Sequence, residues 1–589
     1  MTMSMRKKRQ MPLGKPEMTA WWKDRIVYQI YPRSFQDTPA LNGGQGDGIG
    51  DIPGIILRLD EIKDLGAGII WLSPVYKSPD ADNGYDISDY YSIDPKFGTM
   101  ADMERLFAEA ARRDIKIIMD LVINHTSNEH EWFQKSREPG SPYRDYYIWQ
   151  PGKIAHNGKL YPPNNWTGFF MGEVWEYDEK SGEYYLHLFD KKQPDLNYKN
   201  PKVIEEIKSI LRFWLEKGAS GFRCDVINIL YKTSLRDGKK SIAVCGIEHY
   251  KCQEGNHAVL RELRRDVLDH YDCFTVGETV MVDLKEAKLL CDEDRKELNM
   301  LFYFEHLEID RRVARFIPKK FRASKLLEVF TKWQRGLGWN AVYIENHDQS
   351  RIVSHFGAAR KCLSGGRPAK YWERSAKMLA LMELTLRGTI FIFQGQEIGM
   401  TNFDYKSLDE VNDVESHGLN KLMKKLHIPG FLRWKWIRAS SRDNSRTPMQ
   451  WDDGENAGFS HPCNGVSGQV KPWLGVNSNY RYINYASQKN NPASVLNFYK
   501  ALISLRQKSE CLKSGEFIPL CADDRHMLYG RRLGDEAYIV ALNFSQRKIK
   551  LPKEVAAFLR GSLVIANTER KESDGYLLPW EGMLVKVSL

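Results

Sequence analysis

The chain has 589 residues, which is too many for one compact core and predicts two or three domains. Its 42% hydrophobic and 28% charged residues are usual for a soluble globular protein. The net charge of +10 is spread along the chain, and its densest cluster is Arg6-Lys7-Lys8-Arg9. We interpret this cluster as part of a disordered, solvated leader, residues 1–20, and expect no nucleic-acid partner.

The sequence also indicates where the protein resides. No stretch is apolar for long enough to cross a bilayer, and the basic cluster is not followed by the apolar segment of a secretory signal. The nine cysteines are scattered without a CxxC pair, which is typical of reduced thiols. We expect a cytoplasmic protein without a membrane partner, and either a monomer or a weak homo-oligomer.

Eight short apolar runs, with helical patterns between them, predict the strands of a closed parallel (β/α)8 barrel, an α/β fold. In chain order they are residues 26–31, 69–72, 115–123, 221–224, 273–276, 300–304, 341–344 and 389–393. The connection after the third run is too long for a simple loop, and connections of that length are usually functional. From about Pro519, short β-type runs alternate with turns, which predicts an all-β C-terminal domain.

Three stretches end an apolar run with an acid, at Asp225, Glu278 and Asp348. This pattern predicts buried parallel strands with a carboxylate at the C-terminal end, where barrel enzymes collect their catalytic groups. Converging acids suit chemistry at a sugar carbon, in which one carboxylate attacks and another protonates the leaving oxygen. Taken singly, each acid could equally be the N-cap of a following helix.

The residues around these acids resemble glycoside hydrolase family 13, the α-amylase family. Four of its motifs occur in family order, at residues 120–125, 221–225, 276–278 and 345–348. Within the family, the stretches 26–35, 83–90 and 442–451 look most like the oligo-1,6-glucosidase and α-glucosidase group. The resemblance implies a catalytic TIM barrel at 21–125 and 198–506, a small domain inserted at 126–197, and a C-terminal β-sandwich domain at 507–589.

The resemblance also implies the catalytic roles. Asp225 would be the nucleophile of a retaining mechanism, and Glu278 would act first as the acid and then as the base. Arg223 lies two residues before Asp225, so both side chains should face the same way, and we expect this cation to hold the pKa of Asp225 down. Asp348 would stabilise the positive charge that develops on the sugar ring.

Other residues are expected to bind the sugar. By resemblance, His125 and His347 would hydrogen-bond it from opposite sides, and Tyr85 would stack under its ring. Asp86, together with Arg442 or Arg446, would grip the outer hydroxyls of a terminal glucose. Such a blocked site would make an exo-acting enzyme.

Val226 directly follows the expected nucleophile, and its identity bears on which glycosidic linkage the enzyme would cleave. In the family, a Val at this position looks like the oligo-1,6-glucosidase type, because pocket shape beside the leaving sugar favours one linkage by about 1–3 kcal/mol. The alternative is that Val226 is simply a β-branched residue packed at a strand end.

No cofactor is expected to be required. A structural calcium ion is an open expectation, because related chains often carry an Asp-rich loop. Asp37, Asp47, Asp51 and the Ile49 carbonyl could supply oxygen ligands, although an insertion after Asp37 disturbs their spacing.

These residues predict a retaining exo-α-glucosidase that hydrolyses terminal α-1,6-linked glucose from small isomaltose-type oligosaccharides. Three alternatives within the same class stay open: an α-1,4-glucosidase, a sucrose-cleaving or isomerising enzyme, and a trehalose-6-phosphate hydrolase. The segment 308–312 (Glu-Ile-Asp-Arg-Arg) departs from the Arg-Leu-Asp-Arg loop of sucrose isomerases. From a different class, a non-catalytic module like the heavy subunits of amino-acid transporters would lack the acids that this chain keeps.

Overall fold

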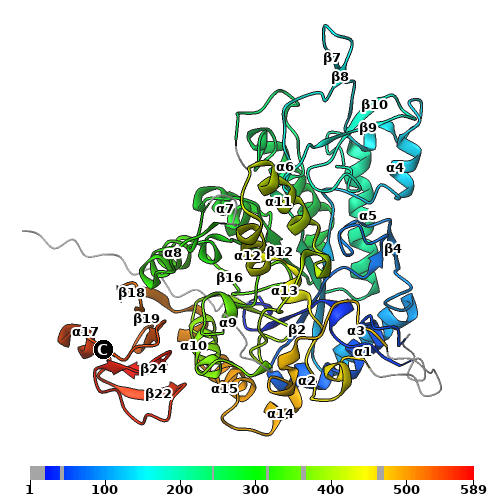
Figure 1. The fold of residues 1–589 in the computed structure, drawn as a ribbon. Coiled ribbons are helices and arrows are strands. Elements are labelled where there is room, and N and C mark those ends of the chain that lie inside the picture. Colours follow the sequence, from blue (N-terminus) through cyan, green and yellow to red (C-terminus); the bar gives the residue numbers. More distant parts are fainter. Residues whose placement is uncertain are drawn as a thin grey trace, which may run out of the picture.

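The computed structural model describes residues 20–39, 46–241, 244–312, 317–359, 366–460 and 470–588. The expected leader, apart from Ala20, lies outside these residues. At the centre of the molecule is an eight-stranded sheet whose neighbouring strands pair in parallel (Figure 1). Its strands are β1 (Val27–Ile30), β2 (Ile69–Leu72), β5 (Lys116–Leu121), β11 (Gly221–Cys224), β12 (Phe274–Glu278), β13 (Met300–Phe302), β16 (Ala341–Val342) and β17 (Thr389–Phe393).

Neighbouring strands follow the chain order around this sheet, and the two end strands, β13 and β16, contact each other. The predicted α/β fold, a closed (β/α)8 barrel, is therefore confirmed. Several strands are shorter than their apolar runs, and among them β5 stops at Leu121 and β16 at Val342. The chain thus leaves the sheet before it reaches Asn124 and His125 of the 120–125 motif and before the 345–348 motif begins.

Helices connect the barrel strands. They are α1 (Ile52–Leu57), α2 (Leu59–Leu65), α3 (Met100–Arg112), α5 (Pro201–Lys217), α6 (Glu254–Asp266), α7 (Leu284–Cys291), α8 (Ala323–Gly336), α9 (Ile352–His355) and α10 (Trp372–Leu384). Local sequence fixes where several of them begin. Thr99 and Asp102 form a capping box at α3, and Asn200 caps α5 with Pro201 in its first turn. Their buried faces join the barrel strands in one continuous core.

The segment between β5 and α5 forms a small layer of its own. It contains α4 (Glu131–Ser136), β6 (Trp149–Gln150), β7 (Lys153–Ile154), β8 (Leu160–Tyr161), β9 (Trp175–Asp178) and β10 (Glu183–Leu186). Strands β6, β10 and β9 pair antiparallel, and the β7–β8 hairpin projects away from the body (Figure 1). A separate apolar cluster fills this layer, and it includes Val226 from the barrel.

A second insertion follows β17 and contains α11 (Val414–Lys425), α12 (Gly430–Ser440) and α13 (Asp443–Arg446). After α14 (Tyr485–Lys489), α15 (Val495–Lys508) and α16 (Glu510–Ser514), the chain forms a five-stranded antiparallel sheet in the order β18-β19-β20-β24-β22. Its bounds are β18 (Glu516–Ala522), β19 (His526–Leu533), β20 (Glu536–Asn543), β22 (Ser562–Ala566) and β24 (Gly582–Val587). It contacts α8 and α10, which joins it to the barrel.

The remaining short elements are β3 (Tyr76–Lys77), β4 (Asp89–Ile93), β14 (Arg311–Arg312), β15 (Ile317–Pro318), β21 (Ile549–Lys550), α17 (Lys553–Ala557) and β23 (Tyr576–Leu577). Within the described ranges, every helix is too short or too polar to cross a membrane.

Candidate active site

Two of the three acids expected at the barrel mouth, Asp225 and Glu278, meet around one buried arginine. Register pairs Arg223 of β11 with Asp120 of β5, and Glu278 ends the next strand, β12. One terminal nitrogen of Arg223, Nη1, lies 2.7 Å from Asp120 Oδ1 and 2.9 Å from Asp225 Oδ1. The other, Nη2, forms an ion pair with Glu278 Oε2. A single planar guanidinium therefore holds the expected nucleophile and the expected acid side by side.

A glycine allows β11 to approach β12 this closely. Gly221 has φ +143°, and a Cβ there would lie 2.0 Å from the Phe274 carbonyl oxygen. Only glycine adopts this conformation in this space. The start of the Gly221–Asp225 motif therefore has a structural explanation, since it sets the spacing of the two strands that carry Asp225 and Glu278.

The electrostatics of Asp225 differ from the expectation. Burial raises the pKa of Asp225 well above its ordinary value, the carboxylates of Glu278 and Asp120 add to this, and Arg223 opposes it. Arg223 acts to lower this pKa as expected, but burial and the two neighbouring carboxylates outweigh it, so the net shift is upward. Burial also raises the pKa of Asp120 to about 6.

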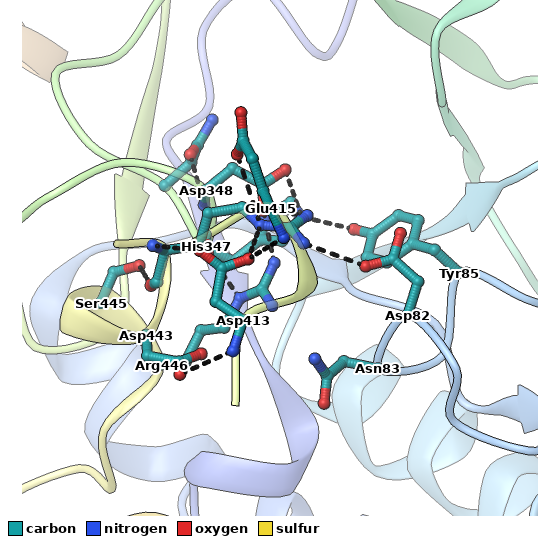
Figure 2. A network of polar contacts seen from close by, with 12 residues as sticks. Asp82, Asn83, Tyr85, His347, Asp348, Asp413, Glu415, Asp443, Ser445 and Arg446 are labelled. Carbon is teal, nitrogen blue, oxygen red and sulfur yellow. Dashed lines mark hydrogen bonds and ion pairs between the residues drawn. The ribbon is translucent and has the colours of Figure 1, made fainter. Parts of the chain in front are cut away.

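Asp348 has the opposite environment. Its Oδ1 lies 2.5 Å from Arg446 Nη2 and 3.6 Å from Arg442 Nη1, and its Oδ2 lies 3.3 Å from His347 Nε2 (Figure 2). Burial acts to raise the pKa of Asp348, but His347 and the surrounding arginines outweigh it and lower this pKa far below its ordinary value. Asp348 is therefore an ionised carboxylate at neutral pH.

The rings of Tyr85 and His347 stack on each other between Asp120 and Asp348. Their rings are nearly parallel, with centroids 5.3 Å apart, and the Tyr85 hydroxyl lies 2.7 Å from His347 Nε2 and 3.1 Å from Asp120 Oδ2. The other ring nitrogen of His347, Nδ1, lies 2.8 Å from Gln29 Nε2. Burial lowers the pKa of His347 to about 3, so this ring is neutral. Sugar stacking on Tyr85 stays a prediction.

His125 is also buried and bonded within the protein. Its Nε2 lies 3.0 Å from the Tyr85 carbonyl oxygen, and its Nδ1 lies 3.3 Å from Asn124 Nδ2. Burial lowers the pKa of His125 to about 4. The ring therefore supports the Tyr85 segment, and its expected contact with the sugar stays a prediction.

The arginine network involves Asp82 rather than Asp86. Asp86 accepts hydrogen bonds from Ser78 Oγ and from the Ala81 and Asp82 amides, so it organises its own loop and meets neither arginine. Arg442 Nη2 instead lies 3.1 Å from Asp82 Oδ1, and its Nε lies 2.7 Å from Asp413 Oδ1. Figure 2 shows Asp82 and Asp413 facing this network from two sides.

This network also distinguishes the two candidate arginines. Arg446 binds Asp348 and the His347 carbonyl oxygen and is fully buried, so it holds the acid in place. Arg442 is the arginine that reaches Asp82 at the edge of the site.

Val226 has an unusual backbone for its residue type. Its φ of +35° and ψ of 42° lie in the left-handed region, which β-branched residues rarely adopt. Its side chain packs in the same apolar cluster as Ile229 and residues of the inserted segment. Val226 therefore joins the loop after Asp225 to the inserted segment.

The four residues proposed for calcium do not form a ligand cluster. Asp37 accepts hydrogen bonds from the Gly48 amide and Ser460 Oγ, Asp51 caps α1 through the Gly54 amide, and exposed Asp47 accepts from the Ile49 amide. In the described parts of the chain, no three acidic, histidine or cysteine side chains are grouped to hold a metal. As placed, these residues do not fit a calcium site.

Sequence reasoning missed Asp120, Asp82 and Asp413. Asp120 opens the 120–125 motif, so that motif already contained a signal for it. Asp82 directly precedes the Asn83–Tyr90 stretch but stands in a turn without periodicity. Asp413 lies in the second insertion and had no signal that we recognise.

Comparison with known proteins agrees with this geometry. The family model for the α-amylase catalytic domain matches residues 29–515. The chain belongs to the α-amylase family. It is 45% identical to an oligo-1,6-glucosidase of Parageobacillus thermoglucosidasius, over 97% of this chain and 99% of the relative. It is 39% identical to a trehalose-6-phosphate hydrolase of Bacillus subtilis, over 98% and 99%.

Solved structures of the family are similar as well. An isomaltulose synthase from Klebsiella sp. LX3 superposes with a TM-score of 0.88 at 39% identity, and the match covers 97% of this chain and all of that one. Relatives with this architecture are therefore named for different reactions, and the fold alone does not determine which glycosidic linkage is cleaved.

Proposed function

We propose that this member of the α-amylase family is a retaining exo-α-glucosidase that hydrolyses terminal α-1,6-linked glucose from isomaltose-type oligosaccharides. The observation that carries the proposal is the Arg223 guanidinium, which binds Asp225 and Glu278 at the ends of adjacent strands. Retaining pairs of carboxyl groups lie about 5–5.5 Å apart and inverting pairs about 6.5–9.5 Å. Two carboxylates bridged by one guanidinium favour the shorter separation.

In this proposal, the ionised Asp225 attacks the anomeric carbon while Glu278 gives its proton to the leaving oxygen. Glu278 then takes a proton from water, whose oxygen displaces Asp225 from the glucosyl group. Asp348 is ionised and held by Arg446, so it supplies fixed negative charge opposite the positive charge of the transition state.

The pairing of Arg442 with Asp82 supports exo action. Both side chains are largely buried, and Asp413 binds the same arginine from the second insertion. A carboxylate and a guanidinium held at fixed, buried positions suit the hydroxyls of one terminal glucose, because hydrogen bonds that involve charged groups are the stronger ones.

The α-1,6 preference is supported by the relatives called oligo-1,6-glucosidase and by Val226 beside the nucleophile. Small oligosaccharides as substrates, a cytoplasmic location and a monomer or weak homo-oligomer complete the proposal.

Sucrose conversion is the second candidate, favoured by the similarity to the isomaltulose synthase. The segment that departs from the isomerase loop contributes Glu308 and Arg311 to a small cavity of about 40 Å³ beside Asp348, next to Glu415. These side chains line the same cavity as Asp348, and in this second candidate their identity bears on the choice of acceptor.

The deciding experiment compares kcat/KM on isomaltose, maltose, sucrose and trehalose 6-phosphate, with the products identified. Fastest release of glucose from isomaltose is the expected result. Faster turnover of maltose or trehalose 6-phosphate would refute the linkage, and conversion of sucrose to an isomer would favour the second candidate. No turnover of any substrate would favour the non-catalytic module.

A further inference from the structure

A buried lysine lies behind the histidine of the first motif. Lys232, in the loop after the nucleophile strand, is 2% exposed, and its partner Asp195 is fully buried at the end of the inserted segment. Lys232 Nζ lies 2.6 Å from Asp195 Oδ2, 2.8 Å from Asn124 Oδ1 and 3.2 Å from the Leu230 carbonyl oxygen. These three acceptors match the three N–H donors of an ammonium group.

This arrangement fixes the orientation of the Asn124 amide. Its Oδ1 faces the Lys232 ammonium, so its Nδ2 must face the other way, where it lies 3.1 Å from Asp195 Oδ2 and 3.3 Å from His125 Nδ1. An amide NH2 is only a donor, so His125 Nδ1 must be the acceptor. The ring proton then resides on Nε2 and points to the Tyr85 carbonyl oxygen, 3.0 Å away.

The other neighbour of His125, Gln193, shares the Tyr85 carbonyl oxygen with the ring and does not fix the tautomer. Gln193 Oε1 accepts from the Asp190 amide, which turns Gln193 Nε2 toward Asp82 Oδ2 and the Tyr85 carbonyl oxygen. Gln193 Nε2 also lies 3.1 Å from His125 Nε2, and in the Nε2–H form both nitrogens donate to the Tyr85 carbonyl oxygen and not to each other, so the tautomer rests on the Asn124 and Tyr85 contacts.

We propose that Lys232 is a positioning residue for the reaction: it orients the Asn124 amide and thereby holds His125 in the neutral Nε2–H form that supports Tyr85. The proposal rests on the proposed function, since Tyr85 matters only if it lines the glucosyl site. It assigns a task to a residue that does not itself touch the acids Asp225 or Glu278.

The same network predicts how His125 responds to the loss of Lys232. The charged groups that face the ring are Asp195, which raises its pKa, and Lys232, which lowers it, while burial is the largest cause of its low value. Without Lys232, no cation neutralises the carboxylate of Asp195, and the Asn124 amide is free to turn its oxygen toward His125 Nδ1. Both changes favour a protonated ring.

The test is Lys232→Met, which keeps the apolar stem and removes the ammonium. The pH dependence of kcat/KM is measured on whichever of the four test substrates the wild-type protein cleaves fastest, so the comparison does not depend on the linkage. We expect the acid-side inflection to rise by about one pH unit, as removal of a neighbouring charge commonly shifts a pKa by about 1–3 units. An unchanged inflection in the folded variant would overturn the proposal.

Two further variants keep the test decisive. Lys208 is also buried, at 4% exposure, and binds Glu205, Glu262 and Asp266 away from the site. Lys208→Met should lower Tm and leave the acid-side inflection unchanged. If Lys208→Met shifts the inflection as much as Lys232→Met does, the shift follows from the loss of any buried ammonium group and the proposal is refuted. Asn124→Asp keeps a partner for Lys232 but presents an acceptor to His125, so it should raise the inflection as well. If Lys232→Met does not fold, a wild-type inflection in Asn124→Asp refutes the proposal.

Discussion

Replacing Val226 with Ala tests how the loop after the nucleophile selects the linkage. The change removes two buried methyl groups from the cluster shared with the inserted segment, and each is worth about 0.8 kcal/mol in lost burial. A cavity term adds to this, so we expect a total loss of stability of about 2–3 kcal/mol. The left-handed backbone at φ +35° remains strained by about 1–2 kcal/mol, because Ala keeps its Cβ.

The effect on specificity should be larger than the effect on rate. A methyl group beside the leaving sugar discriminates between substrates by about 1–3 kcal/mol, so the ratio of kcat/KM for isomaltose to that for maltose should fall about ten-fold or more. The assay is steady-state glucose release from both substrates with the same enzyme preparation.

Val174→Ala is the matched control for Val226→Ala. Val174 is fully buried in the same cluster but belongs to the inserted segment, so its loss should reduce Tm and leave the ratio unchanged. The reasoning is refuted if Val226→Ala keeps the wild-type ratio, or if Val174→Ala changes it equally.

Three further predictions follow from the site. Asp82→Asn should raise KM about ten-fold, because a hydrogen bond between charged groups is worth about 1.5–3 kcal/mol, whereas Asp86→Asn should mainly lower Tm. Equal KM values for the two variants would contradict the assignment of Asp82. Calcium added to chelator-treated protein should leave Tm unchanged in calorimetry, and a rise in Tm would show that the loop binds the ion. The stability contributed by His125 and His347 should fall as the pH is lowered from about 6.5 to about 4, because the unfolded chain then binds protons at these rings that the folded state, with pKa values of about 4 and about 3, still excludes. Buried acids such as Asp120, whose pKa is raised to about 6, act in the opposite direction, so the contribution is read as the difference between the wild type and the His347→Gln variant. A pH dependence of Tm that is the same in the wild type and in His347→Gln would argue against a neutral, buried ring at this position.

The barrel was predictable because buried parallel strands are continuous apolar runs, and all eight runs became strands. The acids at strand ends could be located for the same reason. Asp82 could not be located, since its partner Arg442 lies 360 residues away and no local pattern joins them. The conformation of Val226 also had no signal, because a β-branched residue ordinarily indicates a strand.

The electrostatics of the site were less predictable than its location. Arg223 next to Asp225 suggested one cation and one acid, but the neighbouring strands bring Asp120 and Glu278 to the same guanidinium. The direction of a pKa shift depends on all the groups that the fold assembles, and a single strand reveals only one of them.

The separation of Asp82 and Arg442 along the chain has a consequence for biosynthesis. At about 5–20 residues per second, the ribosome adds the arginine roughly 20–70 seconds after the acid it will bind. Strand β1 likewise cannot pair with its parallel neighbour β17 until residues 389–393 have been synthesised. Nascent or prematurely terminated chains therefore lack the Arg442 side of the candidate site, so this site is assembled only after residue 442 has been added.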